Sequence, residues 1–321
     1  MKKIITILIV GILVLMGLEA VAVSNHKISN ILVDEIDQSM TAYDGVLPLG
    51  RTNIFGYYAN LSAAQSFTPE KEILTRAQFL MARNATTLYP CYLAVRDNLT
   101  HEDLAIIALE PDNFPLVNGT PTEEQLAWVE FNFNDIKITL GTTYYLAIYT
   151  ANVIENYYWI AGNGTNIYQN GTVFLSTDDG ATWSELTDAD ACFKTYGRNN
   201  QAPSTPSIDG QTKGKVGVSY NYTFMSTDPD GDDIYYVVNW GCCQNETHTY
   251  GPYASGAEAN VNHTWSEKGT FVIKVKAKDI YDAESDWATF EVRMPRVVSF
   301  QLLLMKLLER FTDVFPILRH L

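Results

Sequence analysis

One stretch decides the fold of this chain, Gly269-Thr270-Phe271-Val272-Ile273-Lys274-Val275-Lys276-Ala277-Lys278-Asp279. From Phe271 to Ala277 every second residue is apolar, and the positions between them hold a valine and lysines. Successive side chains of a β-strand point to opposite faces of a sheet. The alternation therefore predicts a strand with one buried face and one largely cationic, solvent-exposed face.

Two segments that precede this stretch complete a recognisable pattern, Val237-Val238-Asn239-Trp240-Gly241 and His263-Thr264-Trp265-Ser266-Glu267-Lys268. Together the three segments resemble the polycystic kidney disease (PKD) type of immunoglobulin-like domain over residues 203–294. The resemblance implies an immunoglobulin-like β-sandwich that serves as a spacer or binding module in a prokaryotic, including archaeal, exported surface protein. The chain departs from the family at Cys242-Cys243, where an Asp-Gly turn is usual, so any role of that Asp is lost.

The first half of the chain contains short strand-like runs and no convincing long helix. Runs rich in β-branched and aromatic residues between turn residues are typical of strands. We expect strands at 75–81, 91–96, 104–109, 126–133, 143–150, 157–160, 172–176 and 191–196. This number of short strands predicts a jelly-roll-like β-sandwich, and an all-β fold class for the whole chain. Its general pattern is similar to the jelly-roll regions that precede PKD-like domains in exported proteins of archaea and bacteria.

The two ends of the chain have patterns of their own. Lys2 and Lys3 precede an apolar run and the small-residue sequence Ala20-Val21-Ala22, which is the pattern of a secretory signal peptide; an uncleaved signal anchor is the alternative. Near the C-terminus, apolar residues recur at helical spacing with charges between them, which predicts an amphipathic helix for peripheral membrane or partner contact.

These patterns together predict the organisation of the whole chain. We expect a signal peptide at 1–22, a jelly-roll-like β-sandwich at 23–197, a linker at 198–207, a PKD-type domain at 208–294 and an amphipathic tail at 295–321.

The charge of the chain restricts its partners. Its 37 acidic and 22 basic residues give a formal net charge of −15. Nucleic acid repels such a chain unless a basic patch compensates, and the sequence has no strong basic cluster. We therefore expect no nucleic-acid partner.

Export makes disulfides and glycans available to the chain. Cys91 and Cys192 both lie in strand-like runs of the first half, and we expect them to form a disulfide. For the adjacent Cys242 and Cys243, free thiols, intermolecular pairing and a vicinal disulfide remain open.

Nine Asn-x-Ser/Thr sequences are candidate glycosylation sites: Asn60, Asn84, Asn98, Asn118, Asn163, Asn170, Asn221, Asn245 and Asn262. The alternative for the Asn-Gly sites is turn geometry alone.

A run of carboxylates, Asp228-Pro229-Asp230-Gly231-Asp232-Asp233, is a candidate metal site. Ca²⁺ takes six to eight oxygen ligands, which closely spaced carboxylates supply. The run is not an EF-hand loop, so a distant residue such as Asp279 would have to contribute. The candidate calcium ligands are Asp228, Asp230, Asp232 and Asp279, but an acidic turn between strands, in which Pro and Gly serve the turn geometry, is the interpretation that we favour.

Motifs of catalysis are missing from the sequence, which has no H-E-x-x-H pair, no G-x-S-x-G elbow and no glycine-rich phosphate loop. Residues Ser176 to Trp183 match the Asp-box pattern S-x-D-x-G-x-x-W, but a single copy predicts a β-hairpin turn and no propeller.

Because these catalytic motifs are missing, we expect a non-catalytic cell-surface binding or adhesion protein for a surface glycan or envelope protein. Three clustered aromatics could stack on a sugar: Tyr157, Tyr158 and Trp159. For each single ring, packing in the sandwich core or across strands is the alternative that we favour. The alternatives are a structural cell-envelope component with spacer domains and an accessory part of an extracellular hydrolase.

Overall fold

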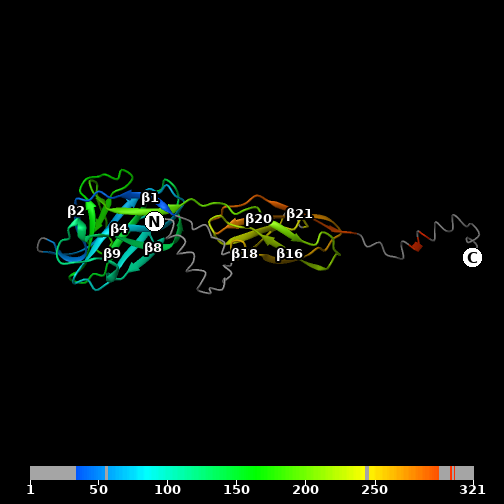
Figure 1. The fold of residues 1–321 in the computed structure, drawn as a ribbon, viewed down its shortest axis with the longest axis horizontal. Coiled ribbons are helices and arrows are strands. Elements are labelled where there is room, and N and C mark those ends of the chain that lie inside the picture. The colour runs from blue at the N-terminus through cyan, green and yellow to red at the C-terminus, as the bar shows by residue number, and fades with distance from the viewer. Residues whose placement is uncertain (1–33, 55–56, 243–245, 296–303, 306, 308–321) are drawn as a thin grey trace, which may run out of the picture.

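The computed structural model describes residues 34–54, 57–242, 246–295, 304, 305 and 307. These residues fold into two β-sandwich domains that lie end to end along the long axis of the molecule (Figure 1). The predicted signal peptide and almost all of the predicted amphipathic tail lie outside the described residues, so both stay predictions. No helix within the described part of the chain has the length and apolarity needed to cross a membrane.

The first domain is a single fourteen-stranded sheet that folds over on itself. Its strands are β1 (Glu35–Met40), β2 (Gly45–Ile54), β3 (Tyr57–Phe67), β4 (Ile73–Asn84), β5 (Cys91–Arg96), β6 (Ala105–Leu109), β7 (Leu116–Val117), β8 (Ala127–Lys137), β9 (Tyr144–Thr150), β10 (Asn156–Asn163), β11 (Val173–Ser176), β12 (Ser184–Leu186), β13 (Asp190–Ala191) and β14 (Phe193–Arg198). Two short 3₁₀ helices, η1 (Pro111–Asn113) and η2 (Glu123–Gln125), lie between strands.

Strand β3 joins the two halves of this sandwich. The main path runs β1-β14-β4-β10-β2-β3-β9-β5-β6, and β3 pairs with β2 in one half and with β9 and β11 in the other. Side chains from both halves meet in one core that includes Phe79, Leu93, Phe131 and Leu146, all fully buried. Residues alternate along β8, where Val129, Phe131 and Phe133 are buried in the core while Glu130 and Asn132 between them are exposed.

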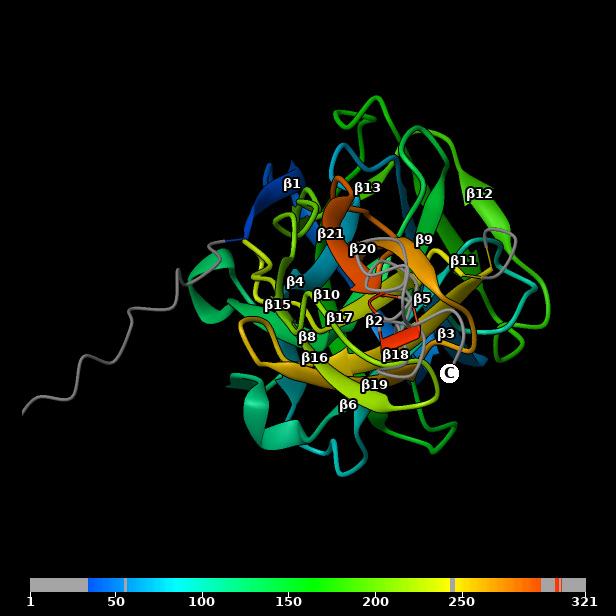
Figure 2. The ribbon, with the colours of Figure 1, turned by 90° about the vertical axis from the view of Figure 1, so that its right-hand side faces the viewer.

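The second domain is a sandwich of two sheets, as the resemblance implied. Its strands are β15 (Ser207–Gly210), β16 (Ser219–Met225), β17 (Ile234–Asn239), β18 (Thr247–Tyr253), β19 (Ala259–Thr264), β20 (Gly269–Asp279) and β21 (Ala288–Met294). Sheet β15-β16-β19 faces sheet β18-β17-β20-β21, and Figure 2 views these strands along the long axis in front of the first domain. The alternation in β20 is confirmed, because Ile273, Val275 and Ala277 are fully buried.

Aromatic rings fill one end of the core of the second domain. His263 stacks flat on Trp240, with ring centroids 4.2 Å apart and an interplanar angle of 4°. Trp265 also packs against His263, edge to face, with ring centroids 4.5 Å apart. Burial, with a smaller contribution from the nearby charge of His248, lowers the pKa of His263 to about 4. The imidazole is therefore neutral at pH 7 and packs as an aromatic ring.

The second domain is expected to lose stability as the pH falls from about 6.5 to about 4. His263 takes up a proton at its ordinary pKa of 6.5 in the unfolded chain but only near 4 in the fold. The contribution of His263 to the free energy of unfolding is complete above pH 6.5. It is lost as the pH falls toward 4, because the unfolded chain then binds a proton that the folded chain does not. Thermal melts across this window should show a steeper decline for the parent chain than for a His263→Phe variant, which keeps the stacking without a titrating group. Equal slopes would contradict this assignment.

Candidate functional site

The aromatic residues predicted to contact a ligand lie on β10, a central strand that pairs with β2 and β4. The prediction is wrong for Tyr158, which is fully buried against Phe114 and donates its hydroxyl to the carbonyl of Tyr89 at 2.6 Å. Tyr157 is also buried, at 9% exposure. Trp159 is half-buried and packs against the edge of Tyr157. A central strand buries its rings against both neighbours, so β10 offers no aromatic platform.

Accessible aromatic rings lie instead on the outer face of the half formed by β11, β3, β9, β5 and β6. Three alanines form the floor of this face. Ala64 of β3, Ala147 of β9 and Ala94 of β5 stand directly opposite one another across the sheet. Each is at most 1% exposed, because larger side chains lean over them. Small residues surrounded by large ones leave a depression in the sheet surface.

Four aromatic side chains surround the alanine floor: Tyr145, Tyr149, Phe174 and Trp183. Tyr149 stacks on its cross-strand neighbour Tyr92, with centroids 5.4 Å apart and an interplanar angle of 11°. Tyr145 meets Phe174 edge to face at 5.6 Å. Pairs of this kind stabilise one orientation of each ring, so the face is preformed.

The Asp-box turn between β11 and β12 holds Trp183 over this face. The hydroxyl of Ser176 accepts the amide of Gly180 at 2.8 Å, and Asp178 accepts the amide and the hydroxyl of Thr182 at 2.8 and 2.6 Å. The indole nitrogen of Trp183 donates to the carbonyl of Gly180 at 3.1 Å. The bonds from Thr182 lower the pKa of Asp178 to about 2. The expectation that this motif is a hairpin turn is confirmed.

Between the turn and the sheet lies a cleft of about 200 Å³, which we call the aromatic cleft. Its lining residues are Ser62, Arg96, Tyr149, Asp179, Gly180 and Trp183. Arg96 is fixed by Asp103, at 2.5 Å, and by the carbonyl of Leu99, at 3.1 Å. Asp179 accepts hydrogen bonds from the side-chain amides of Asn60 and Asn152, the latter at 2.9 Å.

The aromatic cleft combines ring faces with fixed polar groups. Tyr149 and Trp183 offer apolar surfaces, while Ser62, Arg96 and Asp179 offer a hydroxyl, a guanidinium and a carboxylate. Ligand sites commonly pair apolar walls with a few polar groups that set orientation. The sequence signal for this site is the pattern of aromatic and alanine at alternate positions, Tyr145-x-Ala147-x-Tyr149.

The predicted metal ligands lie where the two domains meet, in a group we call the acidic junction. Asp228, Asp230 and Asp232 can bring one carboxylate oxygen each within 4.8 Å of one another. Asp279 is not part of this group; its Oδ1 accepts the amides of Tyr281 and Ala283 at 2.8 Å each, and its Oδ2 accepts the side-chain amide of Asn200 at 2.7 Å. The structure thus assembles three of the four predicted ligands.

A cation from the first domain already faces this cluster. The guanidinium of Arg198, at the end of β14, lies 3.2 Å from carboxylate oxygens of both Asp230 and Asp232 and 3.3 Å from Asp135 of β8. Its side chain is 8% exposed, and that of Asp230 is fully buried. This ion pair was not predicted from the sequence, since residue spacing gives no sign of which cation folding brings to an acidic loop.

Two buried oxygens of the acidic junction remain without hydrogen bonds. One carboxylate oxygen of Asp228 accepts the amides of Asp230 and Asp232 at 2.9 and 3.2 Å, but its other oxygen, Oδ2, has no partner among the described residues. The same holds for Oδ1 of Asn200. Burial raises the pKa of Asp228 and of Asp232, and Arg198 opposes the rise at Asp232. Calcium at this cluster stays a prediction.

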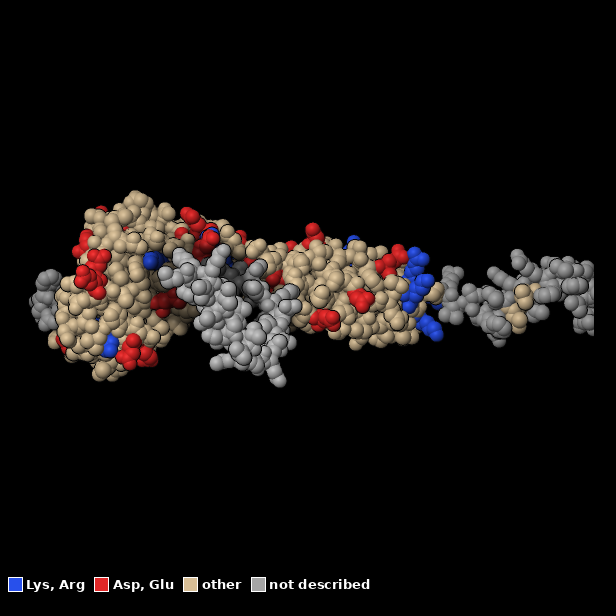
Figure 3. Space-filling view, in the orientation of Figure 1, with Lys and Arg blue, Asp and Glu red and all other residues tan. Residues whose placement is uncertain are grey.

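The charged side chains on the surface reflect the excess of acidic over basic residues in the sequence. Acidic side chains are scattered over the visible face of both domains, and lysines and arginines gather at the far end of the second domain (Figure 3).

The expected disulfide between Cys91 and Cys192 is wrong, because both residues are buried free thiols. Cys91 begins β5 in one half of the sandwich, while Cys192 lies between β13 and β14 in the other half, with its sulfur 3.5 Å from the carbonyl of Ala42. Burial raises the pKa of Cys192 to about 12 and that of Cys91 further. In the second domain the sulfur of Cys242 lies 3.6 Å from Nε2 of His263, and Cys243 lies outside the described residues.

The candidate glycosylation sites differ in accessibility. Asn60 and Asn84 are buried, and their amide nitrogens donate to Asp179 and Thr86, so the fold argues against glycans there. Asn163 is half-buried, and Asn245 lies outside the described residues. The exposed sites, where glycosylation stays a prediction, are Asn98, Asn118, Asn170, Asn221 and Asn262.

The chain has a likeness among the solved structures. No protein-family model matches the chain, and no curated protein matches it. Among solved structures, the chain is similar to the "PKD domain of M14-like peptidase from Thermoplasmatales archaeon SCGC AB-540-F20". The match has 50% sequence identity, covers 30% of this chain and 99% of that chain, and has a TM-score of 0.29. The likeness therefore covers less than a third of this chain.

Proposed function

The second domain of this chain belongs to the PKD family, and we propose that the chain is an exported, non-catalytic surface protein in which this domain is a spacer and the first domain binds carbohydrate. The aromatic cleft is the observation that carries the proposal. An aromatic ring with apolar faces matches the C–H face of a pyranose, and polar groups at the rim match its hydroxyls. An extracellular location agrees with the signal-like pattern of Lys2, Lys3 and the apolar run that follows them.

The geometry supports recognition of a single sugar unit rather than a long chain. The volume of about 200 Å³ is below the range of about 300–1,000 Å³ that is usual for sites of drug-sized ligands. Tyr149 and Trp183 form the walls, and Asp179 is held by two asparagine amides, so its carboxylate is preoriented. A preorganised site spends little free energy on ordering its own side chains when the ligand binds.

A Trp183→Ala variant is expected to bind the recognised glycan at least about tenfold more weakly, which corresponds to about 1.4 kcal/mol. The parent chain is first screened on a glycan array, and the strongest glycan is then titrated by calorimetry. A Tyr149→Ala variant should weaken binding as well, and circular dichroism checks that both variants fold. Trp287→Ala, at a tryptophan that is 42% exposed in the second domain, is the matched control and should bind as the parent does.

Two results would overturn the carbohydrate proposal. One is an array without signal above background for the parent chain. The other is a glycan whose affinity is the same for the parent and for both cleft variants. The structural alternative, in which both domains are spacers in a cell envelope, predicts the first of these results together with self-assembly on fractionated envelopes.

An accessory role in an extracellular hydrolase is the second candidate function. One observation favours it, the 50% identity to a PKD domain that belongs to an M14-like peptidase. This role predicts that the chain co-purifies with a hydrolase activity from its native envelope. Loss of that activity on further purification would separate the accessory role from activity of the chain itself.

We also infer that the acidic junction takes a calcium ion. The unpartnered Oδ2 of Asp228 and the unpartnered Oδ1 of Asn200 are buried oxygens of the type that Ca²⁺ prefers. The carboxylates of Asp230 and Asp232 are the neighbouring ligands, and they are shared with Arg198. An ion there would add to the contacts that hold the two domains together.

A further inference from the structure

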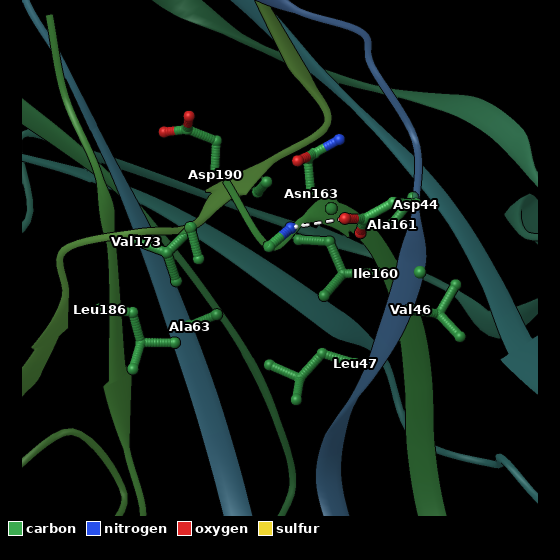
Figure 4. Close-up of a pocket in the computed structure, with 15 residues that line it drawn as sticks. Asp44, Val46, Leu47, Ala63, Ile160, Ala161, Asn163, Val173, Leu186 and Asp190 are labelled. Carbon is green, nitrogen blue, oxygen red and sulfur yellow. Dashed lines mark hydrogen bonds between the residues drawn. The ribbon is translucent and has the colours of Figure 1, made fainter. Parts of the chain in front are cut away.

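A second cavity opens between the two halves of the first domain, away from the aromatic cleft. We call it the inter-sheet pocket, and its volume is about 240 Å³. Figure 4 shows that Leu47 and Ile160 come from one half and Ala63 and Val173 from the other, all around the same space, with Leu186 of β12 beside them. The interior of the pocket is therefore aliphatic.

Small residues keep this space open. Ala63 and Ala161 are at most 4% exposed, yet neither is long enough to fill the gap between the two halves. At the mouth, a Cβ added to Gly45 would meet no atom within 4 Å, so the space in front of this glycine is open. Leu186 is 38% exposed, although an apolar side chain gains by burial. A ligand with an aliphatic part would complete the packing.

The two charged residues that line the pocket, Asp44 and Asp190, are both acidic. Asp44 is exposed, and one of its carboxylate oxygens accepts the amide of Gly164 at 3.0 Å, the bond drawn in Figure 4. Asp190 is 1% exposed, and it accepts the amides of Ile167 and Tyr168 at 2.8 Å each. None of the fifteen lining residues is basic. The field at the mouth therefore attracts cations and repels anions.

We propose that the inter-sheet pocket binds an alkyl ammonium group, with the aliphatic chain inside the pocket and the ammonium beside Asp44. A cavity of about 150 Å³ can hold benzene, so this pocket has room for an aliphatic chain of about six carbons. Asp44 is preoriented by Gly164 and keeps its second oxygen for the ammonium. Asp190 adds negative potential without making direct contact, because one of its oxygens accepts two backbone amides and the other lies 3.5 Å from the side-chain amide nitrogen of Gln65.

Three probes of equal chain length test the proposal on the whole chain: n-hexylammonium, n-hexanol and hexanoate. Titrations followed by NMR should give saturable binding of hexylammonium, at least about fivefold tighter than hexanol, and the weakest binding for hexanoate. An Asp44→Asn variant should remove the preference for the ammonium but keep the binding of hexanol. Asp97→Asn, at an exposed carboxylate outside the pocket, should change neither.

A Gly45→Leu variant places a side chain in the open space at the mouth and should weaken the binding of all three probes. A melting curve verifies that this variant folds.

Four outcomes would overturn the proposal: no saturable binding of any probe, equal binding of ammonium and carboxylate, a preference for the ammonium that survives Asp44→Asn, or hexylammonium binding that is unchanged in folded Gly45→Leu. None of these outcomes depends on whether the aromatic cleft binds sugar.

Discussion

An Arg198→Met variant is expected to be less stable than the parent chain by about 3 kcal/mol or more, which is the usual cost of breaking a buried ion pair by removing one partner. The guanidinium lies 3.2 Å from both Asp230 and Asp232, and the side chain of Asp230 is fully buried. Methionine restores some packing volume but no charge. Asp230 and Asp232 would then have to stay buried as unpaired anions or take up protons.

The loss should appear in both domains, because Arg198 ends β14 of the first domain and its partners Asp230 and Asp232 lie in the second. Chemical denaturation followed by fluorescence measures it. Arg293→Met is the matched control, since Arg293 pairs with Glu291 at the surface with a side chain that is 61% exposed. Such a surface pair contributes at most about 1 kcal/mol. Equal stability of Arg198→Met and the parent would show that the junction depends on other contacts.

Calcium titration of the same variants tests the calcium proposal. Calcium should stabilise the parent chain and should stabilise Arg198→Met more strongly, because removal of the guanidinium frees the carboxylates of Asp230 and Asp232. An Asp228→Asn variant should lose the effect, since Asp228 supplies the unpartnered oxygen. Absence of any heat or shift in melting temperature with both the parent chain and the Arg198→Met variant would contradict the calcium proposal.

A Trp265→Ala variant is expected to lose about 3–5 kcal/mol of stability, confined to the second domain. Trp265 is fully buried and packs against Tyr222, Trp240 and Phe271, with ring centroids 5.6 to 6.1 Å apart. Removal of the indole leaves a cavity among side chains that cannot collapse, because the surrounding strands are fixed by their hydrogen bonds.

Denaturant unfolding of parent and variant measures this loss, with the transition of the first domain as an internal reference. Trp287→Ala is the matched control, because Trp287 is 42% exposed and its main contact is Lys276 over its ring, at 5.1 Å. A loss below about 1 kcal/mol for Trp265→Ala would contradict the described core of the second domain, because a buried indole normally costs several times more to remove.

Where the residues of a strand alternate, the sequence also shows which face of the strand is buried. Along β20 and β8 the buried faces follow directly from sequence, because one side of each strand faces a core and the other faces solvent. Strands β1 to β3 were not predicted. β3 is buried on both faces over residues 61–67, so its sequence shows no alternation.

The sites were harder to predict than the strands, because each is assembled by pairing between distant segments. Tyr158 looks suited to a ligand in sequence, but it lies on a central strand and is buried. The aromatic cleft needs β3, β5, β9 and the Asp-box turn side by side, which sequence spacing does not reveal. The cysteine pair failed for the same reason, since loop length says nothing of which half of a sandwich each thiol occupies.

The central claim is that the aromatic cleft binds sugar, and backbone amide shifts of the labelled chain during titration with the recognised glycan test it most directly. We predict saturable shifts at Ser62, Arg96, Tyr149, Gly180 and Trp183, with none around the inter-sheet pocket or in the second domain. Saturable shifts that spare these residues and fall elsewhere in the chain would contradict the claim.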